Sequence, residues 1–233
     1  MIEITWLGHA TVQFRLESGE VILMDPWIDS NPMYPAGHRI DRVDAILISH
    51  AHFDHIHDAI PLAKEFKPKK VVAIFETCGW LTSKGVENCS GMNKGGTQEV
   101  GPLKVTMTHA IHSCGIQDGD QILYGGEAAG YVLHLPDGRA IYFAGDTAVF
   151  SDMQLLEQLY KPELAFLPIG DFYTMGPREA ALACRLLNVK KVIPMHFGTS
   201  PALTGNPEGL ARELKDFPQT QVWPLAVGKP VKW

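Results

Sequence analysis

The first quarter of the chain alternates apolar and polar positions with a period of two, which is typical of strands with one buried face. Val12, Phe14 and Leu16 show this alternation. Further along, the pattern changes to short continuous apolar runs such as 45–48, which indicate strands buried on both faces. In the second half of the chain such runs alternate with amphipathic segments. We therefore expect many strands first and strand–helix alternation afterwards.

The expected elements follow from this change in pattern. Strands are expected at residues 2–7, 11–16, 21–24, 45–48, 71–75, 103–110, 130–135, 140–144, 164–168, 192–195 and 221–225. Helices are expected near Asp58, after Ser151, at 177–187 and from Asn206. Asp58 is a residue type that suits an N-cap, so we expect its side chain to cap the first of these helices.

Two stretches of the sequence predict irregular structure. Residues 28–42 are rich in Pro, Gly, Asn and Asp, and residues 85–102 are rich in Gly. Long loops in compact domains often bind ligands. No repeat, linker or low-complexity tract divides the chain, so we expect one domain over residues 1–233. In that domain two sheets would pack together with helices outside them.

Composition narrows the possible functions. The 233 residues include 20 Lys and Arg against 26 Asp and Glu, a net charge of −6, which disfavours a nucleic-acid partner. No apolar run is long enough for a membrane span, and the first residues lack the positive charge of a secretion signal. The four cysteines form no C-x-x-C motif, which predicts free thiols. We expect a cytoplasmic protein with a small-molecule substrate and no nucleic-acid or membrane partner; a homo-oligomer stays open.

Four of the ten histidines, including His50, His52 and His55, fall within eight residues, directly after a buried strand. Because residues i and i+2 of an extended segment point the same way, His50 and His52 can present two imidazoles to one metal ion. Asp54 and His55 follow one turn later and can face a second ion. Imidazole and carboxylate together suit zinc, iron or manganese. The alternative is an exposed histidine-rich loop.

The motif H-x-H-x-D-H-x-x-D, formed by His50, His52, Asp54, His55 and Asp58, resembles the metallo-β-lactamase superfamily. Further blocks resemble the superfamily in the same order, at residues 108–113, 144–147 and 194–199. The blocks at residues 6–10, 24–28, 124–130 and 168–176 resemble a narrower group. That group comprises small, mostly uncharacterised metal-dependent hydrolases akin to bacterial ascorbate-phosphate lactonases. The resemblance covers residues 2 to about 226.

The resemblance implies an α/β fold, an αβ/βα four-layer sandwich with metal ions at one edge between the sheets. It implies that one ion is held by His50, His52 and His112, the other by Asp54, His55 and His196, and that Asp146 bridges them. The ions would be divalent: zinc, with manganese, iron or nickel as alternatives. A metal-bound hydroxide would then attack an ester, lactone, amide or phosphodiester. Asp54 is the candidate catalytic residue, because it could also orient the nucleophile or carry its proton.

Some assignments stay open between two interpretations. His112 matches the family block, whereas His109 lies three residues earlier on the expected strand. Asp25 is either a turn residue before a proline or a carboxylate that orients a ligand histidine. His9 either contacts a ligand or the substrate, or is an ordinary residue at a strand end. Tyr34, His38 and Thr174 lie in loops that could line a pocket.

Three functions compete. The first is a binuclear metal-dependent hydrolase of small molecules, and the second is a nuclease that processes RNA or DNA. The third is a non-catalytic metal-binding sensor of the same fold. Redox members of the superfamily tend to carry a carboxylate at the position of His52, so this imidazole favours hydrolysis. Specificity is expected to lie in residues 28–42, 85–100 and 113–128.

Overall fold

The computed structural model describes residues 1–233 and divides into two compact units, each built on a seven-stranded sheet. Unit 1 comprises residues 1–94, 113–128 and 225–233, and unit 2 comprises residues 95–112 and 129–224. The predicted class, a mixed α/β fold with two sheets and helices, is confirmed. That the chain forms one domain stays a prediction. None of the helices combines the length and apolar character needed to cross a membrane.

The sheet of unit 1 has the order β16-β1-β2-β3-β4-β5-β6. Its strands are β1 (Ile2–Trp6), β2 (Val12–Leu16), β3 (Val21–Met24), β4 (Ala45–Leu47), β5 (Lys70–Ile74), β6 (Cys89–Met92) and β16 (Val231–Lys232). Because β1 and β3 are both antiparallel to β2, and β3, β4 and β5 are parallel, β1, β3, β4 and β5 run in one direction. Their carboxyl ends therefore lie at one edge of this sheet.

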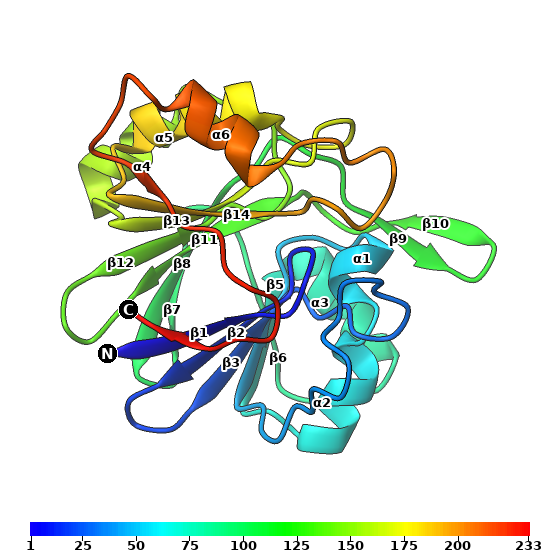
Figure 1. Cartoon of the computed structure of the whole chain (residues 1–233). Helices are drawn as coiled ribbons and strands as arrows, with labels where there is room; N and C mark the ends of the chain where they lie inside the picture. Colours follow the sequence, from blue (N-terminus) through cyan, green and yellow to red (C-terminus); the bar gives the residue numbers. More distant parts are fainter. The chain divides into compact units, whose positions relative to one another are not determined.

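Three helices and one hairpin complete unit 1. The helices are α1 (Phe53–Ile56), α2 (Ala59–Phe66) and α3 (Phe75–Ser83), and Figure 1 shows them in cyan beside the sheet. The hairpin consists of β9 (Gly115–Asp118) and β10 (Gln121–Tyr124). β3, β4 and β5 present almost only buried side chains, as their continuous apolar runs predict.

Unit 2 has a sheet of order β15-β14-β13-β12-β11-β8-β7. Its strands are β7 (Thr97–Val100), β8 (Leu103–His109), β11 (Ala129–His134), β12 (Ala140–Phe143), β13 (Leu164–Pro168), β14 (Lys191–Met195) and β15 (Gln221–Val222). The helices α4 (Met153–Tyr160), α5 (Pro177–Leu187) and α6 (Pro207–Glu213) cover one face of it (Figure 1). β8, β12, β13 and β14 run in one direction, so their carboxyl ends also share one edge.

The core of unit 2 explains why the helices lie on this face. The small buried residues Ala180, Ala183 and Cys184 let α5 approach the sheet closely, and Tyr142 and Leu167 fill the space from the sheet side. All of these side chains are fully buried. This packing fixes the strands that carry candidate ligands at their carboxyl ends.

The sequence prediction was wrong in three segments. Residues 85–102, expected to be irregular, contain β6 and β7, and residues 75–83 form α3, which was not expected. Residues 113–128, where no strand was expected, contain the β9–β10 hairpin, and their role in specificity stays a prediction. β6 reads Cys-Ser-Gly-Met and has no fully buried position, so it lacks the apolar pattern on which strand prediction relies.

Candidate metal centre

The histidine motif in unit 1 follows β4 and begins α1. The Nε2 atom of His50 lies 3.0 Å from Nδ1 of His52. In α1, Oδ2 of Asp54 lies 3.9 Å from Nε2 of His55. The rings of His50 and His55 are 4.1 Å apart between centroids, and both residues are buried. The structure therefore brings these four predicted ligands of the motif together.

Asp25 lies beneath this motif, at the carboxyl end of β3, and its side chain is fully buried. Its Oδ2 atom is 2.8 Å from Nδ1 of His55 and accepts a 2.6 Å hydrogen bond from the Ser49 hydroxyl. Ser49 Oγ is in turn 3.0 Å from Nδ1 of His50. Asp25 thus holds one histidine directly and a second through Ser49. These contacts use the Nδ1 atoms, so Nε2 is the nitrogen of each histidine that could bind a metal ion.

The charge state of Asp25 depends on these contacts. Burial raises the pKa of its carboxyl group, and the contacts with His55 and Ser49 oppose that effect. A buried carboxylate is stable only when it is paired and hydrogen-bonded. The sequence suggested Asp25 on resemblance, but it gave no reason to select Ser49, which lies between the strand and the first histidine of the motif.

His9 follows β1 and is 2% exposed. Its Nε2 atom lies 2.9 Å from Oδ2 of Asp54, and the ligand atoms of His9, Asp54 and His55 all lie within 4.8 Å of one another. Its ring also packs edge-on against Trp27, 5.0 Å between centroids. The structure thus places His9 against a candidate ligand. His9 and Asp25 both have a left-handed backbone, with φ of 54° and 43°, which is rare outside glycine and concentrates at functional sites.

Asp58 has a different role from the helix cap that the sequence predicts. It occupies the position before α2, but its side chain makes no capping hydrogen bond. Its Oδ2 atom instead accepts the backbone N–H groups of Ile28 and Asp29, at 2.6 and 3.1 Å. The expectation of a helix cap was therefore wrong. Two backbone donors of the 28–42 loop compete for the carboxylate, so the last residue of the motif fixes the start of that loop.

Cys114 supports the motif from the β9–β10 side of unit 1. Its Sγ atom accepts a 3.3 Å hydrogen bond from the backbone N–H of Ala51, the residue between His50 and His52. A Cβ at Gly125 would lie 2.3 Å from the Cys114 carbonyl oxygen, so only glycine allows this close approach. No sequence pattern marks Cys114 as a supporting residue, because its contact with Ala51 spans 63 positions.

The remaining predicted site residues occupy loops. Tyr34 and His38 are half-buried in the 28–42 segment, with ring centroids 5.8 Å apart. Burial, and then the charge of Asp58, raise the pKa of Tyr34. Thr174, in unit 2, is half-buried and donates from Oγ1 to the Met175 carbonyl at 3.4 Å. A role for these residues in lining a pocket stays a prediction.

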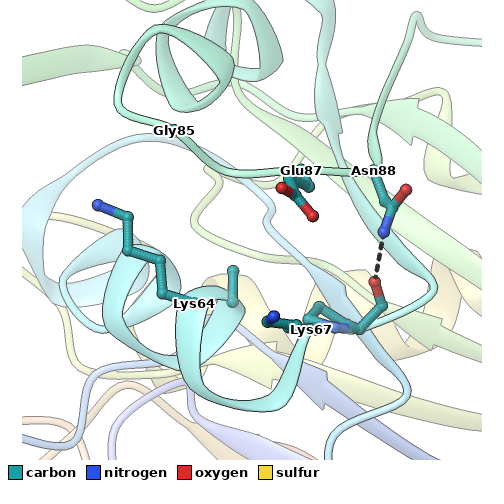
Figure 2. Close-up of a pocket in the computed structure, with 7 residues that line it drawn as sticks. Lys64, Lys67, Gly85, Glu87 and Asn88 are labelled. Atoms are coloured by element: carbon teal, nitrogen blue, oxygen red, sulfur yellow. Dashed lines mark hydrogen bonds between the residues drawn. The ribbon is translucent and has the colours of Figure 1, made fainter.

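One pocket of unit 1 lies apart from this chemistry. It has a volume of about 100 Å³ and lies between α2 and the turn before β6 (Figure 2). Its lining residues include Lys64, Lys67, Glu87 and Asn88. None of the candidate metal ligands is among them. We therefore do not assign it to the candidate metal centre.

Unit 2 carries the other three predicted ligands at the carboxyl edge of its sheet. Asp146 follows β12, His196 follows β14, and His112 follows β8. Oδ2 of Asp146 lies 3.0 Å from Nε2 of His196 and 3.6 Å from Nε2 of His112. His196 has a left-handed backbone, with φ of 56°, and a Cβ at Gly170 would lie 2.0 Å from its carbonyl oxygen. The neighbouring strand end therefore requires glycine at that point.

His109 and His112 differ in their surroundings. His109 is exposed at the end of β8, and its ring packs edge-on against Phe150, 5.3 Å between centroids. His112 is half-buried beside Asp146. We expect His112→Ala to lose bound metal and His109→Ala to retain nearly all of it. Elemental analysis of both variants, purified without an affinity tag, measures this. Equal losses in the two variants would contradict the choice of His112.

Comparison with known proteins identifies the class to which this chain belongs. A family model described as the beta-lactamase superfamily domain matches residues 20–197. The chain therefore belongs to the β-lactamase superfamily, and within it to the UPF0173 metal-dependent hydrolases. The predicted family and the predicted enzyme class, a metal-dependent hydrolase, are confirmed.

The similarity to these relatives spans the chain. A UPF0173 metal-dependent hydrolase of Solibacter usitatus is 69% identical over 232 residues, 100% of both chains. One from Koribacter versatilis is 55% identical over 91% of each chain. Among solved structures, Igni18, a metallo hydrolase of the archaeon Ignicoccus hospitalis, is 32% identical, with a TM-score of 0.86 over 99% of this chain and 97% of that one.

Proposed function

We propose that this enzyme hydrolyses a small molecule at a binuclear metal centre. The proposed ligands are His50, His52, Asp54, His55, His112, Asp146 and His196. The observation that carries the proposal is the buried carboxylate of Asp25, which holds Nδ1 of His55 directly and Nδ1 of His50 through Ser49. Metal-ligating histidines almost always have the other ring nitrogen held in this way. An ordinary buried pair of histidines does not require such a set of contacts. We call the contacts of Asp25 with His55, and through Ser49 with His50, the Asp25 relay.

The donor chemistry fits divalent ions. The proposed ligands are imidazoles and carboxylates with no thiolate, which suits zinc, and manganese, iron or nickel as alternatives. His52, an imidazole where redox members of the superfamily tend to have a carboxylate, favours hydrolysis over oxidation. When bound, two such ions supply a nucleophile by lowering the pKa of water, and they polarise the group to be cleaved.

The ligands divide into two sets, with Asp146 shared. We assign His50, His52 and His112 to one ion, and Asp54, His55 and His196 to the other. The position of Asp146 beside both His112 and His196 supports a bridging role. Chain connectivity gives further support, because His112 is bonded to Ser113, whose hydroxyl lies 3.2 Å from Nε2 of His52.

Asp54 is the proposed catalytic residue. Its Oδ2 atom is held by His9, and its side chain is 20% exposed, whereas Asp25 is fully buried. A carboxylate with one oxygen fixed and partial access to solvent can orient the attacking nucleophile and accept its proton. His9 would act by positioning Asp54.

The substrate class follows from the charge and the reaction. The net charge of −6 disfavours a polyanionic nucleic acid, so we propose a small ester, lactone, amide or phosphodiester. The test is elemental analysis of untagged protein, with hydrolysis of a chromogenic panel (lactone, thioester, β-lactam and bis-phosphodiester) before and after chelation. About two metal ions per chain and turnover that chelator abolishes are expected. Protein that binds no added zinc, manganese or iron would contradict the proposal, and stoichiometric metal without turnover on a wide panel would favour a sensor.

The relay through Asp25 gives a graded prediction. Asp25→Asn places an amide N–H₂ where a carboxylate now accepts from Ser49 and contacts His55. We expect metal affinity to fall roughly 10–100-fold and unfolding free energy to fall by about 1–3 kcal/mol, since a buried polar group loses its partner. Ser49→Ala breaks only the branch to His50, so its loss of affinity should be smaller. Isothermal titration with zinc measures the metal affinity of both variants. Equal losses of affinity in the two variants would contradict the relay.

A further inference from the structure

Cys78 and Cys89 lie side by side in unit 1, on elements that carry none of the proposed metal ligands. Cys78 is in α3 and is 4% exposed, and its Sγ atom lies 3.8 Å from the carbonyl oxygens of both Val71 and Ala73 on β5. Cys89 begins β6 and pairs in register with Val71. A Cβ at Gly91, also on β6, would lie 3.3 Å from Cβ of Cys78. The Cys78 side chain therefore packs against β6, the strand that carries Cys89.

Cys89 Sγ donates to the Val86 carbonyl at 3.7 Å, and each of the two thiols shifts the pKa of the other. The proximity of Cys78, and then of Thr82, lowers the pKa of Cys89, whereas the proximity of Cys89 and burial raise the pKa of Cys78. Cys89 therefore forms a thiolate more readily than an ordinary cysteine, next to a Cys78 thiol that stays protonated. Cys89 is half-buried, so small reagents can reach it, and both cysteines are free.

We propose that Cys89 is a peroxide-reactive thiol and that Cys78 is its resolving partner, so that mild oxidation joins them in an intramolecular disulfide. The Cys89 thiolate attacks a peroxide oxygen, the O–O bond breaks, and a sulfenic acid forms as the leaving oxygen takes a proton from water. The Cys78 sulfur then displaces the sulfenic hydroxyl. The S–S bond forms, the S–O bond breaks, and the Cys78 proton leaves with the hydroxyl as water. Two thiols are oxidised by two electrons and one peroxide is reduced.

The chain contains its own controls. Burial raises the pKa of both remaining thiols, Cys114 and Cys184, to about 12 in the case of Cys184. Each is protonated at neutral pH and shielded from solvent. No second cysteine shifts the pKa of either thiol. We therefore expect oxidation to be selective for the pair in unit 1.

The experiment is oxidation of the full chain with equimolar hydrogen peroxide at pH 7, followed by differential alkylation in denaturant and peptide mapping. We expect Cys78 and Cys89 to be lost together, at least roughly tenfold faster than Cys114 and Cys184, with recovery of a peptide pair linked by a disulfide. Dithiothreitol should restore both thiols. Loss of Cys114 or Cys184 first, or retention of all four thiols at a dose that oxidises the unfolded chain, would overturn the proposal.

Two serine variants separate the roles of the thiols. Cys78→Ser should leave a sulfenic acid on Cys89 that dimedone traps, whereas Cys89→Ser should leave Cys78 reduced. Circular dichroism checks that both variants fold. Trapping at Cys78 in Cys89→Ser, at the rate of the unmodified chain, would show that the roles are wrong. The readout is thiol content, so it is independent of metal binding and of the proposed hydrolysis.

Discussion

Replacing Asp146 with asparagine is expected to remove both metal ions together and to abolish turnover. Asp146 is almost fully buried, and its Oδ2 atom lies near His196 and His112, which we assign to different ions. An amide retains the size of the side chain but loses the negative charge that a bridging ligand supplies to both ions. The loss of turnover should exceed the roughly 10–100-fold typical of losing a residue that only contacts a ligand.

The measurement is metal content per chain by elemental analysis, together with chelator-sensitive turnover on the most responsive substrate of the panel. Asp152→Asn is the matched control, because Asp152 is exposed at the start of α4 and touches none of the proposed ligands. It should keep both ions. Loss of a single ion in Asp146→Asn would show that Asp146 serves one ion and does not bridge.

The proposed ligands could be predicted from the sequence because several of them are close together along the chain. A strand followed by His50, His52, Asp54 and His55 concentrates four donors in six positions, and local geometry brings them together. Asp146 and His196 required the resemblance. Strand order then explains why they meet, since β12 and β14 flank β13 and all three run in one direction.

The residues that support the proposed ligands could not be predicted in this way. Ser49, Cys114 and Asp58 each act through a contact with a residue 24 to 63 positions away. No periodicity or motif marks such a contact. Asp58 is the clearest example, because an aspartate directly before a helix often caps that helix. Here its carboxylate accepts hydrogen bonds from the backbone of the 28–42 loop instead.

The fold was predicted best where burial imposes a pattern. The strands at 21–24 and 164–168 and the helix at 177–187 have the predicted limits, because their faces are packed against a core. β6 and β7 were missed, because each has at most one buried position and is an edge strand of its sheet. These two strands form because they pair with neighbouring strands, and a short stretch of sequence does not contain that partner.

Replacing His52 with alanine is expected to lower metal content and abolish turnover. His52 is half-buried, with Nδ1 3.0 Å from Nε2 of His50 and Nε2 3.2 Å from the Ser113 hydroxyl. Truncation removes one of three proposed imidazole ligands of its ion. Because the His52 side chain is half-buried and does not belong to the hydrophobic core, its truncation should change the melting temperature of the metal-free protein little.

His57→Ala is the matched control for His52→Ala. His57 lies in the same segment, but its side chain is 39% exposed and its contact is with Asp58 and not with a proposed ligand. It should keep its metal and its turnover. Elemental analysis and zinc titration of the two variants side by side separate a ligand from a neighbour in the motif. Normal metal stoichiometry in His52→Ala would remove His52 from the ligand set, and the argument from its imidazole for hydrolysis over redox chemistry would fail with it.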